Sequence, residues 1–140
     1  MQATQHLFAD TLAKSDEWVQ ELARIGGFSS PEQAYSALHA VLPTLRDRLT
    51  VEEAAQLASH LPILIRGVYY EGWRPAAVPE RRRSQQDFLA AIADRLGNSA
   101  LDPERACRAV FEQLERRIAP GEVEEVKHMM HHRLRDFWPL

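Results

Sequence analysis

Apolar residues recur at helical spacing along most of the chain, and stop signals divide the pattern into segments. The first predicted helix covers about residues 4–25, where apolar residues return every three or four positions, and Gly26-Gly27 ends it. Ser30 and Pro31 are typical of a helix cap and first turn, so a second helix should run to about Arg48. Pro43 lies inside it, which predicts a kink or the start of a new segment.

Four more helices are predicted after this point. Thr50 and Glu53 have the spacing of a capping box and begin a third helix, in which we expect Pro62 to cause a kink. Residues 66–80 combine three aromatic residues with helix-breaking glycines and prolines, and are predicted to form an aromatic connector. The remaining helices should begin near Ser84, at Asp102-Pro103-Glu104 and at Pro120-Gly121-Glu122, with the last one running to about Asp136.

The chain contains an internal repeat with a shift of 69 residues. In the ungapped stretch 37–69 the residues identical to their counterparts are Ala37, Ala40, Val41, Leu45, Arg48, Glu53 and Arg66. Chance would give about two identities over this length. An apolar stripe also recurs, as Ala54, Leu57, Leu61 and Ile65 in the first half and as Val123, Val126, Met130 and Leu134 in the second.

Each half is therefore predicted to be a three-helix unit, the first at about residues 4–66 and the second at about 84–138. One unit of about 65 residues would have only a marginal core, whereas two packed units share one. We therefore predict an all-α fold in which two tandem three-helix repeats form one pseudo-twofold helical bundle, a single domain over residues 1–140. The alternative is two separate units on a flexible linker, which would expose the connector's aromatic residues.

Composition narrows the possible partners and the compartment. The net charge is −3 with neutral histidines, which gives no indication of a nucleic-acid partner. No apolar run approaches the roughly 18 residues that span a bilayer, so no membrane partner is expected. The first ten residues lack the features of a secretory signal, and the single cysteine cannot form an intrachain disulfide. These features predict a cytoplasmic protein.

Several strings resemble a known family. They are Arg46-Asp47-Arg48-Leu49, Glu52-Glu53-Ala54-Ala55, Leu61-Pro62, Arg66-Gly67-Val68-Tyr69-Tyr70-Glu71-Gly72-Trp73 and the ending Leu134-Arg135-Asp136-Phe137-Trp138-Pro139. The pattern resembles the signature of domain-of-unknown-function family 2267, a group of small bacterial proteins, over nearly the whole chain. His131 departs from it, because the family often has a proline there, as at the corresponding Pro62. The resemblance implies an all-helical fold and no particular activity.

Three histidines near the C-terminus are candidate metal ligands. His128 and His132 are four residues apart and share a helical face, and Glu125 precedes His128 by three residues. A di-iron bundle needs a second such Glu-x-x-His pair, which the sequence lacks. At about 100° per residue the two histidines also point away from the apolar stripe. We expect solvated side chains and no metal site for these histidines, His131 among them, the alternative being a weak surface site for zinc or nickel.

The sequence contains no recognisable catalytic group. Arg81-Arg82-Arg83 could contact phosphate, but three charges flanked by acidic residues are few for nucleic acid. Cys107 has alanine neighbours and no suitably placed histidine, which favours a core residue over a nucleophile. Nucleotide-binding and hydrolase motifs are absent. We expect no catalytic residues and no cofactor.

The connector supplies the candidate partner-binding residues, Tyr70, Trp73 and Arg74. Side chains of these types often anchor interfaces, and these three have no counterpart in the repeat, whereas Arg66 and Tyr69 do. The alternative is that Trp73 packs inward and closes the seam between the halves.

Two functional hypotheses follow. The first is a non-enzymatic interaction module that binds a protein partner or a second copy of itself. The second is a protein that binds a small ligand or metal in a pocket at the seam between the repeats. An enzyme ranks last, because no acid, base and nucleophile can be named.

Overall fold

The computed structural model describes residues 6–82, 84–130 and 132–139. Within them the chain forms seven α-helices and no strand, so the all-α prediction is confirmed. The helices are α2 (Ala9–Gly26), α3 (Pro31–Arg46), α4 (Val51–Ala58), α5 (Ile63–Tyr70), α6 (Gln85–Leu96), α7 (Pro103–Arg117) and α8 (Pro120–Met129), with the 3-10 turns η1 (His6–Phe8), η2 (Pro75–Ala77) and η3 (Arg135–Phe137).

Predicted caps begin and end several of these helices. The Ser30 hydroxyl accepts the backbone N–H of Gln33 at 3.3 Å, at the start of α3. Thr50 and Glu53 form the predicted capping box of α4, with side-chain-to-backbone distances of 3.2 and 3.0 Å. Gly27 ends α2 in the left-handed region, at φ 63°, a conformation that favours glycine.

Two helices are shorter than the sequence predicted. Pro62 does not kink one helix but separates two, because α4 ends at Ala58 and Pro62 is the N-cap of α5. The last helix ends at Met129 instead of near Asp136, because Met130 has extended backbone angles, φ −86° and ψ 145°. In contrast, α3 continues unbroken through Pro43.

The connector is also shorter than predicted. Helix α5 continues through Gly67 to Tyr70, so residues 66–70 are helical and the connector proper begins at Glu71. A glycine inside a helix costs only about 1 kcal/mol. Packing offsets that cost here, because Ile65 and Tyr69 on the same helix are buried in the core.

An arginine binds the carbonyl groups at the break in each half. Arg66 donates to the carbonyl oxygens of Ala58 and Leu61, both at 3.0 Å. Arg135, its counterpart at a shift of 69, donates to the carbonyl of Met130 at 3.3 Å, and Met130 is the counterpart of Leu61. These carbonyls lie next to helix ends, where backbone acceptors lack helical partners.

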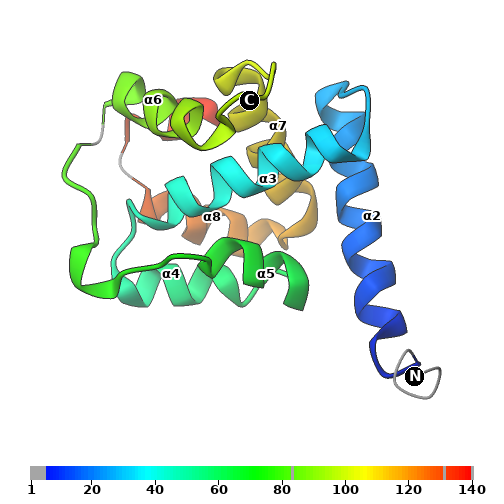
Figure 1. Ribbon diagram of the computed structural model, residues 1–140. Helices are drawn as coiled ribbons and strands as arrows, with labels where there is room; N and C mark the ends of the chain where they lie inside the picture. Colours follow the sequence, from blue (N-terminus) through cyan, green and yellow to red (C-terminus); the bar gives the residue numbers. More distant parts are fainter. Residues whose placement is uncertain (1–5, 83, 131, 140) are drawn as a thin grey trace.

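Helices α3 and α7 lie at the centre of the molecule. Helix α3 packs against α2, α5, α6 and α7, and α7 packs against α2, α3, α6, α8 and η3, as Figure 1 shows in part. Buried apolar side chains from both halves form one cluster. The predicted stripe belongs to it, because each of its residues is at most 3% exposed: Ala54, Leu57, Leu61, Ile65, Val123, Val126, Met130 and Leu134.

Contacts between the halves occur in matching pairs. The guanidinium carbon of Arg48 lies 5.3 Å from the ring centroid of Phe88, and that of Arg117 lies 5.7 Å from the ring of Trp18. Arg117 is the counterpart of Arg48 at a shift of 69, and Phe88 is the counterpart of Trp18 at a shift of 70. A twofold relation between the halves would require such pairing. The contacts support that relation, which stays a prediction.

Candidate functional site

The candidate partner-binding residues of the connector differ in exposure. Tyr70 and Trp73 are partly buried against the core, with ring centroids 5.1 Å apart, whereas Arg74 is exposed. The indole nitrogen of Trp73 is buried and has no hydrogen-bond partner. Burial of this kind supports the seam-closing alternative for Trp73, and partner contact through the three residues stays a prediction.

Arg46, at the end of α3, holds the start of the connector. Its side chain is 2% exposed, and Nη1 donates to the carbonyls of Tyr69 and Glu71 at 3.0 and 2.7 Å. Nη2 lies 2.8 Å from the Asp47 carboxylate. The burial of Arg46 was not predicted from the sequence, because arginine side chains are seldom buried. Its position among the apolar residues of α3 was the available signal.

The connector returns to the end of α3 at Glu80, whose backbone N–H donates to the carbonyl of Asp47 at 2.6 Å. Arg95 reaches the same place from α6 and donates to the Asp47 carboxylate at 3.0 Å and to the hydroxyl of Thr44. A cavity of about 210 Å³ lies here, lined by residues of α3, the connector and α6. It is lined by residues of both halves and of the connector between them.

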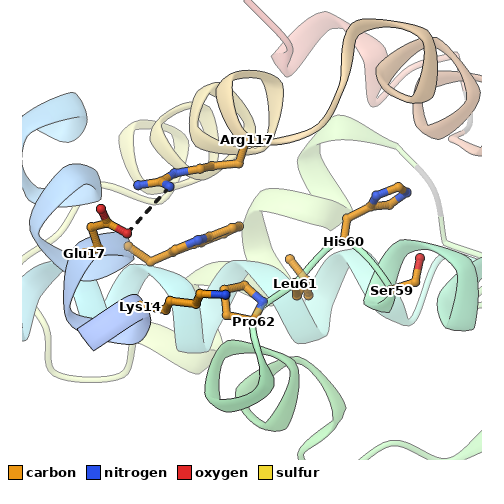
Figure 2. A pocket seen from close by; sticks show the side chains of 8 residues that line it. Lys14, Glu17, Ser59, His60, Leu61, Pro62 and Arg117 are labelled. Carbon is orange, nitrogen blue, oxygen red and sulfur yellow. Dashed lines mark ion pairs between the residues drawn. The ribbon is translucent and has the colours of Figure 1, made fainter. Parts of the chain in front are cut away.

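Two adjoining hollows lie between α2 and the turn that joins α4 to α5. The first, of about 320 Å³, is drawn in Figure 2, where Arg117 lies on one side and Lys14 and Pro62 on the other. The second, of about 290 Å³, shares Lys14, Leu61 and Pro62 with it and extends to Ile63 on α5. Glu17 and Glu21 of α2 lie 4.0 and 2.9 Å from the Arg117 guanidinium and offset its charge in the first hollow.

Large apolar side chains are exposed beside the second hollow. Ile63, which lines it, is 65% exposed, and Leu64 is 44% exposed. Leu7 and Phe8 on η1 and Leu12 on α2, the helix that forms one wall of this hollow, are 75%, 59% and 58% exposed. These last three residues belong to the apolar pattern that predicted the first helix, and such a pattern would lead to burial.

The exposure of the α2 residues has a structural cause. Helix α6, the counterpart of α2, begins at Gln85, which corresponds to residue 15 at a shift of 70. The turns of α2 before Ser15 therefore have no equivalent in the second half. Figure 1 shows this end of α2 extending beyond the other helices. The apolar residues at this end of α2 recur with the spacing of a buried helix face, but no other described helix covers them.

The candidate metal ligands lie on the surface. His128 and His132 are exposed, as predicted, and Nδ1 of His128 lies 2.7 Å from the carbonyl of Glu124. In the part of the chain that the structure describes, no three His, Cys, Asp or Glu side chains are placed to hold a metal ion. His131 lies outside the described residues.

The other candidates have structural roles or lie on the surface. Cys107 is fully buried, and burial raises the pKa of its thiol far above the usual range, so the prediction of a core residue is confirmed. Arg81 and Arg82 are exposed, and Arg82 pairs with Glu80 at 3.3 Å. Arg83 lies outside the described residues.

Comparison with protein families agrees with the resemblance seen in the sequence. The family model for DUF2267 matches residues 15–137. The chain belongs to this family. DUF2267 is described as an uncharacterized conserved protein, so membership brings no activity with it. No match was found among curated proteins. None of the described helices of this DUF2267 chain is long and apolar enough to cross a membrane.

Proposed function

We propose that this DUF2267 protein is a non-enzymatic interaction module of the cytoplasm that binds a second copy of itself. Its contact surface, the α2–α5 surface, consists of Leu7, Phe8, Leu12, Ile63 and Leu64. The observation that carries the proposal is the exposure of all five side chains, between 44% and 75%, on elements that contact each other, with Ile63 lining the hollow between α2 and α5. Apolar residues gathered in this way on a small protein often mark an interaction site.

The charges around the α2–α5 surface favour a second copy over a strongly charged partner. Asp10 and Glu17 bring negative charge, and Lys14, Arg66 and Arg117 bring positive charge, all as lining residues of the two hollows, and Arg117 is paired with Glu17 and Glu21 of α2. A twofold interface must be complementary to itself, which a surface with balanced charge can satisfy. The extended end of α2 also forms one wall of the second hollow, so two copies could pack these ends against each other around a twofold axis.

The association can be tested by sedimentation velocity over a concentration series. We expect a concentration-dependent dimer that is weakened about 30-fold in Leu12→Asp and in Ile63→Asp, as for an interface anchor worth about 2 kcal/mol. Val51→Asp is the matched control, because Val51 is 43% exposed at the start of α4 and lies outside the surface. A monomer at every concentration would contradict self-association.

Photo-crosslinking in cells separates the identity of the partner from the place of contact. A crosslinking residue at position 12 should give a product with the mass of two chains, and none at position 51. A crosslinked product with another protein would show that the α2–α5 surface binds a different partner and not a second copy. A product from position 74 alone would place the contact at Tyr70, Trp73 and Arg74 instead.

A further inference from the structure

The cavity at the end of α3 has a concentration of arginine side chains. We call it the arginine cavity, and its charged lining consists of Arg46, Arg74, Arg95, Asp47 and Glu80. Its volume of about 210 Å³ is below the roughly 300 Å³ at which pockets for larger organic ligands begin. A ligand of the size of a single phosphate or carboxylate group would fit it.

Both carboxylates of the arginine cavity already accept hydrogen bonds from arginines. Oδ1 of Asp47 accepts Nε of Arg46 at 2.9 Å, and Oδ2 accepts Nη2 of Arg95 at 3.0 Å. Oε1 of Glu80 accepts both the backbone N–H and Nε of Arg82, at 3.2 and 3.3 Å. Asp47 therefore links the arginines of α3 and α6, and Glu80 is engaged with Arg82 of its own connector.

The remaining polar groups of the lining are mainly donors. A guanidinium carries five N–H donors and no acceptor. Arg95 uses its two terminal nitrogens toward Thr44 and Asp47, which leaves its other N–H groups available. Arg74 is exposed, and its side chain has neither a hydrogen bond nor an ion pair with any described residue. The cavity therefore offers more donors than its own acceptors can satisfy.

A further arginine adds buried positive charge to the same group. Arg48 is 9% exposed, and its Nε is buried without a hydrogen-bond partner. Burial lowers the pKa of Arg48, while attraction to Glu80 and Asp47 raises it and repulsion from Arg95 lowers it. An anion in the cavity would offset the repulsion among these cations.

The internal repeat indicates that the shared fold does not require this arrangement. Arg46 and Asp47 correspond to Glu115 and Arg116 in the second half. Arg95 corresponds to an isoleucine in α2 at a shift of 70, and Arg74 has no counterpart. The second half forms the same helices without these arginines.

From this geometry we propose that the arginine cavity binds a small oxyanion, reversibly and without covalent chemistry. Guanidinium groups match the oxygen spacing of phosphate, sulfate and carboxylate, and their hydrogen bonds to an anion are charge-assisted. Arg95 is fixed by its hydrogen bonds to Thr44 and Asp47 and forms the prearranged donor of the site, while Arg46, whose donors are mostly engaged by Asp47, Tyr69 and Glu71, adds positive charge. Arg74 completes it from the exposed rim. The site differs from the α2–α5 surface and does not depend on self-association.

Calorimetry and NMR on the full chain test this proposal with inorganic phosphate, sulfate and acetate at constant ionic strength. We expect phosphate to bind and to shift the Nε–H signals of Arg46, Arg74 and Arg95. In Arg74→Gln the dissociation constant should rise at least tenfold, with an unchanged thermal midpoint. Acetate binding as tight as that of phosphate would identify the ligand group as a carboxylate, and weaker acetate binding would identify it as a phosphate or sulfate.

Arg81→Gln is the matched control, because Arg81 is an exposed arginine of the same connector that does not line the cavity. Its affinity for phosphate should equal that of the parent protein. The proposal is overturned by the absence of both heat and signal shifts. It is also overturned if Arg81→Gln weakens binding as much as Arg74→Gln, since the anion would then respond only to overall charge.

Discussion

The side-chain amide of Gln56 donates a hydrogen bond to the carboxylate of Glu125, at 3.3 Å, and these two residues occupy equivalent positions of the internal repeat. Equivalent residues approach each other only near the axis that relates two copies. This contact between α4 and α8 therefore indicates where a twofold axis would pass, and it agrees with the matched arginine–aromatic contacts elsewhere.

The first prediction is that both arginine–aromatic contacts between the halves stabilise the fold. Double-mutant cycles with Arg48→Met and Phe88→Leu, and with Arg117→Met and Trp18→Leu, should both give favourable coupling energies in urea denaturation. We expect about 2 kcal/mol for the buried Arg48 pair and about 1 kcal/mol for the Arg117 pair, whose arginine is 28% exposed. Coupling in one pair and none in the other would argue against equivalent packing of the halves.

The second prediction concerns the buried stripe. Leu61→Ala and Met130→Ala should each lower the free energy of unfolding by roughly 2–4 kcal/mol, because both side chains are at most 3% exposed and leave a cavity when truncated. Ile63→Ala is the control, since Ile63 is 65% exposed. Its effect should stay within about 0.5 kcal/mol. Equal midpoints for all three variants would show that the stripe is not part of the core.

Local features of the fold were predictable from the sequence. The capping box of Thr50 and Glu53 depends on residues three positions apart, so spacing alone indicates it. The repeat likewise located Leu61 and Met130 in equivalent buried positions. The break after Met129 could have been anticipated as well, because it falls at the repeat position where Pro62 separates α4 from α5.

Long-range features were not predictable in this way. The periodicity of Leu7, Phe8 and Leu12 predicted an apolar face. Whether such a face is buried depends on the element that packs against it. Because the counterpart helix α6 is shorter than α2, the repeat does not predict such an element for the first turns of α2. The arginine cavity unites Arg46 and Arg95, which are far apart in the sequence. Neither residue type nor local spacing indicates that two such side chains share a carboxylate.

The third prediction separates the two interpretations of Trp73. Because the ring is partly buried against Tyr70 and the core, Trp73→Ala should cost about 3 kcal/mol of stability, at the low end for a large aromatic side chain. Trp73→Phe should be nearly neutral, since the indole nitrogen has no hydrogen-bond partner to lose. Unchanged stability of Trp73→Ala together with weaker self-association would instead identify Trp73 as an interface anchor.

The fourth prediction is that His128 and His132 do not form a tight metal site. Both are exposed, and an exposed pair of imidazoles supplies too few ligands for a closed zinc site. One equivalent of zinc should leave the thermal midpoint unchanged, both in the parent protein and in the His128→Ala, His132→Ala double variant. Stoichiometric metal in the purified parent protein that is lost in the double variant would contradict this.

The last prediction concerns the pH dependence of stability through Glu21. Its carboxylate accepts Nε of Arg117 at 2.9 Å and Nε2 of Gln113 at 3.0 Å. Burial raises the pKa of Glu21, but the two hydrogen bonds and the positive charges of Arg117 and Arg116 lower it by more, so the net pKa is below the ordinary 4.5. A pKa lowered by folding contributes stability above the unfolded-state pKa, and this contribution is lost as the pH falls through the folded-state pKa.

Glu21→Gln should therefore destabilise the protein at pH 7 by about 1.5 kcal/mol, the low end of the range for a hydrogen bond to a charged group. The difference from the parent protein should shrink as the pH falls below 4.5 and vanish once Glu21 is protonated in the folded state, as measured by urea denaturation at several pH values. Glu17→Gln is the control, because Glu17 is 66% exposed and lies 4.0 Å from Arg117. An exposed pair of this kind contributes little, so Glu17→Gln should follow the parent protein at every pH. A Glu21→Gln difference that persists unchanged in acid would show that the loss comes from packing rather than from the ionised carboxylate.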